Sequence, residues 1–565
     1  MKNTQSRADE NLMTVLGLIA ASILIAATLE RGPGLGAYLP WASALVQGTP
    51  APLASVGERI TLSPTGFPLF HWYPGTGVFL ALPTLLSGGA VNLQHSARLA
   101  ASIAILLTLA FCASLFYEIA RKRVGLLLLG MSLLLVATNT GYYIRLLGAE
   151  LFVLAVVASI VWLAWIPQKI GNVELVGFSA LASLLMTVRP QSIMMAWPAL
   201  VLGLLRWASG RPRPQLAWAF LYCGVPVALG LLVLIQLNHW MTGEWTRSPY
   251  YFGNGQFKSV ALSAPYIRLV LFDPQAGVFR CTPFIALGLC ASLVPILDRR
   301  LDKPYRAFYL VSLLAGLAQI WIISGFYGWA GGAWIFGSRY LNPLSLYGVI
   351  AVVHVLASER VAWAIKAVVL SVALACAAYT ARLLGLPYFL GSLAVGATAA
   401  AWIAVSKTRP RHSAPDMAYG CLGLSLLFPI LYYYAWLARA QVAAVLTTPA
   451  MMLAYVAAVV IVIALYLIWR AFPSPSTAAK GVATFSVFTL VLGLSLVARL
   501  RVGAAVFQAR ELASPSPQFL YRTSFDVRDL EEDLKQETVY KLPDDVKHAI
   551  RVFLEDEKRR TAIRR

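Results

Sequence analysis

The chain repeatedly runs through apolar stretches of the length that crosses a lipid bilayer, separated by short polar loops. A transmembrane helix needs about 20 mostly apolar residues. Of the 565 residues, 59% are apolar and only 13% are charged, and the mean hydropathy is +0.70. This composition excludes a soluble globular protein. The apolar runs lie at residues 11–29, 95–119, 124–139, 149–166, 174–188, 190–205, 216–237, 281–297, 307–324, 341–357, 362–383, 385–405, 417–437, 449–469 and 481–498. They predict an all-α polytopic membrane protein with about 13–15 transmembrane helices.

The net charge of +21 would suit a nucleic-acid-binding protein, but the basic residues are not arranged for that role. They sit in short loops between apolar runs, as is typical of cytoplasmic loops. We therefore expect no nucleic-acid partner, and we expect residues 140–148, 240–280 and 325–340 to face the outer side. The basic loop residues are Arg121, Lys122 and Arg123; Arg206, Arg211 and Arg213; Arg299, Arg300, Lys303 and Arg306; and Lys407, Arg409 and Arg411.

The membrane region has polar segments on both sides. Residues 1–10 form a short polar N-terminus, residues 11–500 the membrane domain, and residues 501–565 a soluble tail that we expect to be small and helical. Within the membrane domain, residues 30–94 are predicted to form an outer loop. An apolar stretch at 72–86 is interrupted by prolines and glycines, so we expect it to lie on the outer surface as a helix rather than to span.

A loop rich in glycine and aromatic residues, at 327–343, ends in an arginine at the start of the next apolar run. There Arg339 is suited to bind a phosphate at the membrane surface, because its planar guanidinium matches phosphate geometry. Trp329 and Trp334 are candidates for stacking on a sugar. The alternative is that Arg339 extends to the lipid headgroups and that the tryptophans form an interfacial belt.

Acidic residues are scarce in the membrane domain, with only eleven between positions 11 and 500. Glu30 ends the first apolar run, Glu58 lies in the first loop, and Glu150 opens the run 149–166. Two such carboxylates near an outer face would supply a general base for an acceptor hydroxyl and ligands for a divalent cation, Mg²⁺ or Mn²⁺. For each acid the alternative is a solvated helix end.

Six short motifs occur in a characteristic order. They are Glu30 with Gly36-Ala-Tyr-Leu-Pro40, Thr65-Gly-Phe-Pro-Leu-Phe-His-Trp-Tyr-Pro-Gly75, Val188-Arg189-Pro190, Asn238-His239 before Gly243 and Tyr250, Asp273-Pro-Gln-Ala-Gly-Val-Phe279 with Pro283, and Phe336-Gly-Ser-Arg-Tyr340. In this order, over about residues 11–360, the chain resembles the bacterial branch of the GT-C membrane glycosyltransferases, relatives of the protein O-mannosyltransferases and of lipid A aminoarabinose transferase.

The resemblance implies an outer cavity in which a polyprenyl-phosphate sugar donates its sugar to a glycan, lipid or protein acceptor. By matching motifs, Glu30 and Glu150 would be the catalytic acids and the ligands of any metal, and Arg339 and Tyr340 would bind the donor phosphate. Because Glu30 is followed by Arg31 where the family spacing differs, Glu58 is an alternative base. Arg189 is a further cavity residue, or it satisfies carbonyls freed by Pro190. The remaining cavity candidates are His71, Trp72, Tyr73, Asn238, His239, Trp329 and Trp334.

Other functional classes remain open from the sequence. A transporter or lipid flippase also uses intramembrane arginines, although no second copy of the 325–343 element is visible. A non-catalytic envelope assembly protein and a polymer ligase are further alternatives. If the protein is an enzyme, we expect Glu30, Glu150 and Arg339 to share one outer cavity. Under that reading, the protein is a multi-pass protein of the bacterial cytoplasmic membrane.

Overall fold

The structure is a computed structural model, and it describes most of the chain between residues 75 and 429. The described residues are 38–39, 42–43, 46, 61–62, 68–69, 75–89, 93–146, 148–167, 169–209, 211, 217–242, 245, 264, 266–273, 277–325, 339–384, 386, 389–405 and 415–429. The predicted N-terminal segment 1–10 and the tail 501–565 lie outside them.

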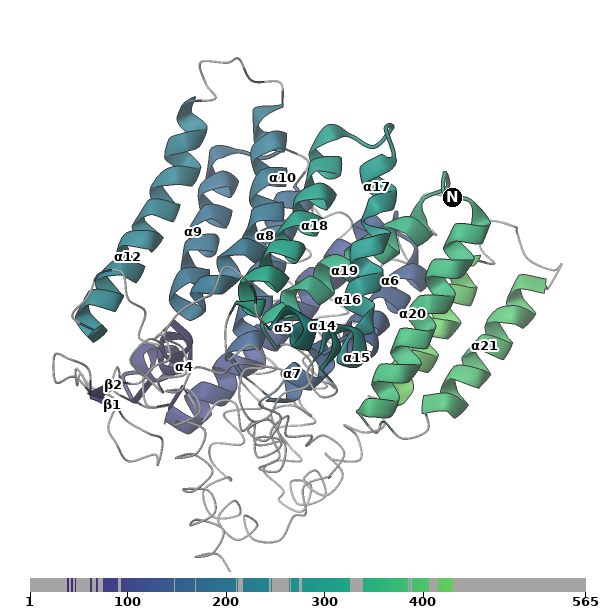
Figure 1. Cartoon of the computed structure of the whole chain (residues 1–565), viewed down its shortest axis with the longest axis horizontal. Helices are drawn as coiled ribbons and strands as arrows, with labels where there is room; N and C mark the ends of the chain where they lie inside the picture. Colours follow the sequence, from purple (N-terminus) through teal and green to yellow (C-terminus); the bar gives the residue numbers. More distant parts are fainter. Residues whose placement is uncertain are drawn as a thin grey trace, which may run out of the picture.

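The described part of the chain is almost entirely helical (Figure 1). Its two strands, β1 (Thr61–Leu62) and β2 (Pro68–Leu69), form one antiparallel pair in which Thr61 faces Leu69. The helices are α4 (Gly75–Leu86), α5 (Leu93–Ile119), α6 (Val124–Ser132), the π-helix η2 (Leu133–Ala137), α7 (Thr140–Leu146), α8 (Ala149–Trp165), α9 (Asn172–Val188), the 3₁₀ helix η3 (Pro190–Ala196), α10 (Trp197–Ala208), the π-helix η4 (Phe220–Gly224), α12 (Val225–Thr242), α14 (Ile267–Phe272), α15 (Val278–Cys281), α16 (Pro283–Ala291), α17 (Leu293–Leu297), α18 (Lys303–Ser324), the 3₁₀ helix η5 (Arg339–Leu341), α19 (Asn342–Ala357), α20 (Trp363–Leu383) and α21 (Phe389–Val405). Residues 415–429 are also helical.

Four segments of the described chain are both long and apolar enough to cross a bilayer as single helices: Ala217–His239, Lys303–Ser324, Arg339–Ala357 and Trp363–Leu383. Shorter apolar helices accompany them, among them Val124–Ala137, Ala149–Trp165 and Pro283–Leu297. The protein is an all-α polytopic membrane protein, as the sequence predicted. The expected total of about 13–15 spans includes runs 449–469 and 481–498, which lie outside the described residues, so that number stays a prediction.

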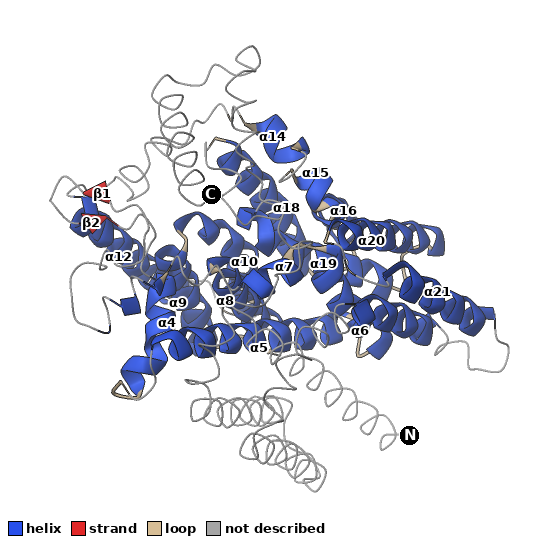
Figure 2. Cartoon of the chain, turned by 90° about the horizontal axis from the view of Figure 1, so that it is seen from below, coloured by secondary structure: helices blue, strands red, loops and turns tan. Residues whose placement is uncertain are grey.

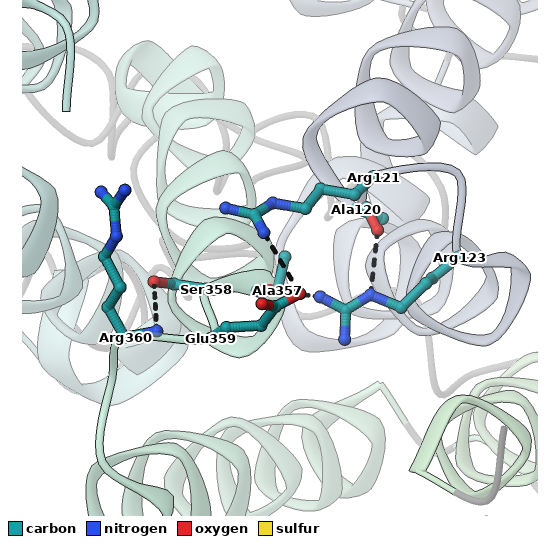
Figure 3. Close-up of polar contacts among 7 residues, drawn as sticks. All are labelled: Ala120, Arg121, Arg123, Ala357, Ser358, Glu359 and Arg360. Atoms are coloured by element: carbon teal, nitrogen blue, oxygen red, sulfur yellow. Dashed lines mark hydrogen bonds and ion pairs between the residues drawn. The ribbon is translucent and has the colours of Figure 1, made fainter. Parts of the chain in front are cut away.

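Three polar loops, 121–123, 298–303 and 358–360, meet at one end of the helix bundle, which we call the basic end. Arg121 Nη1 lies 3.3 Å from Glu359 Oε1, and Arg360 Nη1 lies 3.4 Å from Asp298 Oδ2. Arg123 donates to the carbonyl of Ala357, the last residue of α19 (Figure 3). These contacts place loops of the predicted cytoplasmic set on the same side of the protein.

Short helices, including α4, α7, α14 and α15, occupy the opposite end (Figure 1), which Figure 2 shows face-on. The path of α8 relates the two ends. Trp165 at its last turn packs against Tyr305 at the start of α18, with ring centroids 4.8 Å apart. Glu150 at its first turn is therefore about 22 Å away along the helix axis. The stretch predicted to lie on the outer surface contains α4, a helix of 12 residues, shorter than the about 20 residues of a typical span. Its place on the outer surface stays a prediction.

The central element is α19, which begins near the end of the bundle opposite the basic end and finishes at the basic end. It packs against α5, α6, α8, α16 and α20. In the apolar segment Arg339–Ala357, which includes α19, 94% of an 18-residue stretch is buried inside the protein. Its closest neighbour is α16, because Gly288 and Gly348 face one another. A Cβ atom added to Gly288 would lie 2.2 Å from Gly348 Cα. Small residues at such a crossing let two membrane helices approach closely.

We expect Gly288→Val to destabilise the protein by about 1–3 kcal/mol, because the new side chain forces α16 away from α19. Thermal unfolding of the detergent-solubilised protein measures this change. Gly177→Ala is the matched control, since a Cβ atom there meets no other heavy atom within 4 Å. Equal unfolding temperatures for the two variants would contradict the close crossing at Gly288.

Candidate functional site

Glu150 is a buried carboxylate in the first turn of α8, at the end of the protein opposite the basic loops. The residue is only 2% exposed. The helix follows Gly148, whose extended backbone ends the preceding loop. An acidic side chain in a first helical turn is favoured by the helix dipole. Packing of α8 against α5, α9 and α10 encloses this turn, so the carboxylate needs polar partners within the protein.

Arg189 lies at the junction between α9 and η3. Proline disfavours a helical conformation in the residue before it, and Arg189, followed by Pro190, has extended backbone angles (φ −160°, ψ 96°). The helix therefore ends at Val188, and the chain continues as a 3₁₀ turn. The side chain of Arg189 is also only 2% exposed. A sequence-visible helix break thus places an arginine inside the bundle.

Arg339 and Tyr340 form the 3₁₀ turn η5 directly before α19. Pro343 lies in the first turn of α19, where its missing N–H carries no penalty and its fixed φ suits a helix start. Tyr340 is buried, whereas the Arg339 side chain is 12% exposed. Arg339 is therefore the more accessible of the two arginines.

Glu150, Arg189, Arg339 and Tyr340 meet in one group, which we call the arginine cluster. Arg189 Nη2 donates to Glu150 Oε1 at 2.8 Å, and Arg339 Nε lies 3.5 Å from the same oxygen. Both guanidinium carbons approach the ring of Tyr340, at 5.0 Å and 5.2 Å from its centroid. These distances lie within the cation–π range. Four of the predicted site residues therefore form one buried polar site.

Tyr38 from the first loop joins this cluster. It is 4% exposed, and its hydroxyl shares a hydrogen bond with Arg189. Burial raises the pKa of Tyr38 to about 12, against the lowering effect of the nearby arginines. The phenol therefore stays protonated at neutral pH. Tyr38 lies in the motif Gly36-Ala-Tyr-Leu-Pro40, but the sequence predicts no role for it, because its contact with Arg189 joins segments about 150 positions apart in the chain.

A buried polar layer anchors the start of α19 behind the cluster. Thr140 Oγ1 donates to Asn342 Oδ1 at 3.1 Å, and Ser345 Oγ donates to Asn139 Oδ1 at 3.2 Å. All four residues are completely buried. These bonds tie α19 to the turn between η2 and α7, so the adjoining η5 and its arginine have a fixed base. Sequence analysis did not single out this layer.

Several predicted site residues lie outside the described residues, and two lie on another helix. Asn238 and His239 belong to the last turns of α12, where Asn238 is buried and the imidazole of His239 stacks on Trp245 with ring centroids 3.9 Å apart. Their role in a substrate cavity stays a prediction. Those outside the described part are Glu30, Glu58, His71, Trp72, Tyr73, Trp329 and Trp334.

The described site residues do not fit the predicted divalent cation at Glu150. Two guanidinium groups approach its Oε1 oxygen, and their positive charges oppose a cation there. Within the described residues, no group of three His, Cys, Asp or Glu side chains is arranged to hold a metal ion. The sequence expectation also involved Glu30, which lies outside that part of the chain.

The arrangement favours recognition of an anion rather than proton abstraction by Glu150. That carboxylate already accepts a hydrogen bond from Arg189 and faces Arg339, so it is poorly placed to take a proton from an acceptor hydroxyl. What it does is hold two planar guanidinium groups in place. Arginines ordered in this way bind phosphate oxygens through charge-assisted hydrogen bonds, and partial burial strengthens them.

Comparison with known proteins finds likeness only at the level of solved structures. No family model and no curated protein matches the sequence. The structure is similar to ArnT, lipid A aminoarabinose transferase, from Cupriavidus metallidurans, bound to undecaprenyl phosphate. The two share 16% sequence identity and a TM-score of 0.41, over 89% of this chain and 81% of ArnT.

A second similar structure is the archaeal oligosaccharyltransferase AglB from Archaeoglobus fulgidus, in complex with an inhibitory peptide and a dolichol-phosphate. It shares 13% identity and a TM-score of 0.35, over 72% of this chain and 59% of AglB. Both proteins are GT-C members.

Proposed function

We propose that the protein is a membrane glycosyltransferase that moves a sugar from a polyprenyl-phosphate donor to a glycan, lipid or protein acceptor on the outer face of the membrane. The observation that carries this proposal is the pair of arginines ordered by Glu150. Arg189 and Arg339 approach one carboxylate oxygen, at 2.8 Å and 3.5 Å, at the end of the bundle remote from the basic loops. The GT-C motif resemblance agrees with this choice of chemistry.

The chemistry requires a cation at the leaving group. When the bond between the sugar carbon and the phosphate oxygen breaks, the polyprenyl phosphate gains negative charge. A guanidinium fixed in a partly dehydrated site stabilises that charge better than one in water, since it needs no reorganisation. Arg339, with 12% of its side chain exposed, is the group that meets the donor phosphate, while buried Arg189 supports it through Glu150.

The roles of the remaining groups follow from this assignment. Glu150 acts as the counter-ion that positions the arginines, and the general base for the acceptor hydroxyl is Glu30 or Glu58. The Tyr38 phenol is protonated at neutral pH, and burial raises its pKa further. Its hydroxyl can therefore donate a hydrogen bond to an oxygen of the lipid-linked sugar. A divalent cation, if the reaction uses one, binds away from Glu150.

The charge of the loops indicates on which side of the membrane the reaction takes place. Positively charged loops favour the cytoplasmic side, so the basic end faces the cytoplasm and the arginine cluster lies on the side of the outer leaflet. In a bacterium this orientation supports a location in the cytoplasmic membrane. The donor then reaches the site from the bilayer, which suits a lipid-linked sugar.

Mass spectrometry of envelope glycans and lipid-linked sugars tests the function. We expect a deletion strain to accumulate one polyprenyl-phosphate sugar and to lose one glycan modification. Complementation with the wild-type chain restores both, whereas the Arg339→Ala chain at equal expression does not. Unchanged lipid-linked sugars and glycans in the deletion strain would argue against glycosyl transfer. Accumulation of a donor on the cytoplasmic leaflet alone, with intact transfer in isolated membranes, would point to a lipid flippase instead.

A further inference from the structure

A second polar site lies at the basic end, far from the arginine cluster. A cavity of about 270 Å³ opens between the start of α9, the end of α10 and the start of the Ala217–His239 span. Its lining residues are Asn172, Trp207, Arg211, Trp218 and Tyr222. None of them is acidic. The cavity therefore combines an arginine, an amide and three aromatic rings where the bundle meets the predicted cytoplasmic membrane surface.

Arg211 is held in a defined orientation on the wall of this cavity. Its guanidinium carbon lies 4.2 Å from the ring centroid of Trp207, and its Nη1 donates to Asn172 Oδ1 at 3.2 Å. Trp207 itself is 1% exposed and donates its indole N–H to the same Oδ1 atom at 2.9 Å. The ring of a buried tryptophan and the side-chain amide of Asn172 thus hold the Arg211 guanidinium in place.

The aromatic rings on the other wall form a continuous surface. Trp218 and Tyr222 stack with ring centroids 6.4 Å apart and planes 29° from parallel, and Asn172 Nδ2 donates to the Tyr222 hydroxyl at 3.2 Å. Trp218 is 55% exposed. A half-exposed tryptophan near the end of a predicted span suits the boundary between acyl chains and headgroups.

The neighbouring Arg206, in contrast to Arg211, has a purely structural role. Its guanidinium donates to the carbonyl oxygens of Ala164 at 2.6 Å and Trp165 at 2.8 Å, and also to that of Pro167. It therefore caps the end of α8. The Arg211 side chain caps no helix: within the described residues its guanidinium donates to Asn172 and lies over the ring of Trp207. Only its backbone N–H contacts the end of α10, where it donates to the Ala208 carbonyl at 3.1 Å. Of its five guanidinium N–H groups, the described part of the chain engages one, through Asn172.

We propose that this cavity binds the phosphate of an anionic phospholipid headgroup in the cytoplasmic leaflet. The phosphate accepts hydrogen bonds from Arg211, and the lipid's glycerol and upper acyl chain lie along Trp218. A soluble phosphate monoester carries the same chemistry, but the exposed tryptophan and the position at the membrane surface favour a lipid. This proposal is independent of glycosyl transfer, because the arginine cluster lies at the other end of the bundle.

Native mass spectrometry of the full-length protein in detergent tests the site, with phosphatidylglycerol as the probe and phosphatidylcholine as the neutral comparison. We expect the wild type to retain at least one phosphatidylglycerol tightly. Arg211→Gln should weaken that binding about fivefold or more, since a charge-assisted hydrogen bond to phosphate is lost. Arg211→Lys should recover only part of it, because lysine does not lie flat on Trp207.

Lys169→Gln is the matched control, since it removes an exposed cation near the same end but not from the cavity. It should leave lipid binding unchanged. Equal phosphatidylglycerol binding by wild type and Arg211→Gln, at equal unfolding temperature, would overturn the proposal. Displacement of the lipid by millimolar sn-glycerol 3-phosphate would show that the phosphate group dominates recognition. Failure of the soluble compound to compete would show that the acyl chain contributes, as expected from Trp218.

Discussion

Replacing Arg339 with lysine is expected to weaken use of the polyprenyl-phosphate donor tenfold or more, equivalent to about 1.4 kcal/mol of lost interaction. Lysine keeps the positive charge but not the planar fork that contacts two phosphate oxygens at once. It also loses the guanidinium contact with the Tyr340 ring, now 5.2 Å from the ring centroid. Arg339→Ala should be weaker still. The measurement is the initial rate of transfer in membranes as the concentration of lipid-linked donor is varied.

The kinetic parameters that change in Arg339→Lys identify the substrate that Arg339 binds. The apparent KM for the donor should rise or the maximal rate should fall, while the dependence on acceptor concentration stays as in the wild type. Arg280→Lys serves as the control, because Arg280 is an exposed arginine of α15 at the same end of the bundle. Wild-type donor kinetics in Arg339→Lys would reduce Arg339 to a membrane anchor.

The features that depend on local chemistry could be predicted from the sequence. Helices formed where apolar runs reach spanning length, α9 ends before Pro190 as a proline break requires, and Arg339 stands at the start of a helix that Pro343 begins. The gathering of basic loops at one end also followed from their charge. Each of these depends on residues that are close together in the chain.

The contact between Glu150 and Arg189 could not be predicted in the same way. Glu150 and Arg189 are 39 positions apart, and their contact depends on how α8 and α9 pack. Without that contact, the sequence suggested a catalytic role for Glu150. In the structure two guanidinium groups approach the carboxylate, which favours a positioning role. The buried pair of Asn342 and Thr140 was missed for the same reason, since the two residues are 202 positions apart and neither belongs to one of the six motifs. Glu30 lies outside the described residues, so its predicted role as the base still awaits a test.

Replacing Glu150 with glutamine is expected to have the largest effect on stability. Glutamine keeps the size of the side chain but removes the charge that Arg189 and Arg339 face inside the protein. Removing one partner of a buried ion pair typically costs about 3–5 kcal/mol, because the remaining charge stays buried without compensation. The unfolding temperature of the solubilised protein should fall clearly below that of the wild type, and transfer activity should be lost as the arginines lose their orientation.

A double variant separates this positioning role from catalysis by Glu150. In Glu150→Gln/Arg189→Gln the buried arginine charge is removed together with the carboxylate, so stability should recover relative to the sum of the two single changes, by about 0.5–3 kcal/mol. Activity should not recover with it, because Arg339 has lost its counter-ion. If instead Glu150→Gln unfolds like the wild type and lacks only transfer, then Glu150 acts directly on the substrate, as the motif resemblance implied. If the single and double variants both retain full transfer, the arginine cluster is not the site of sugar transfer.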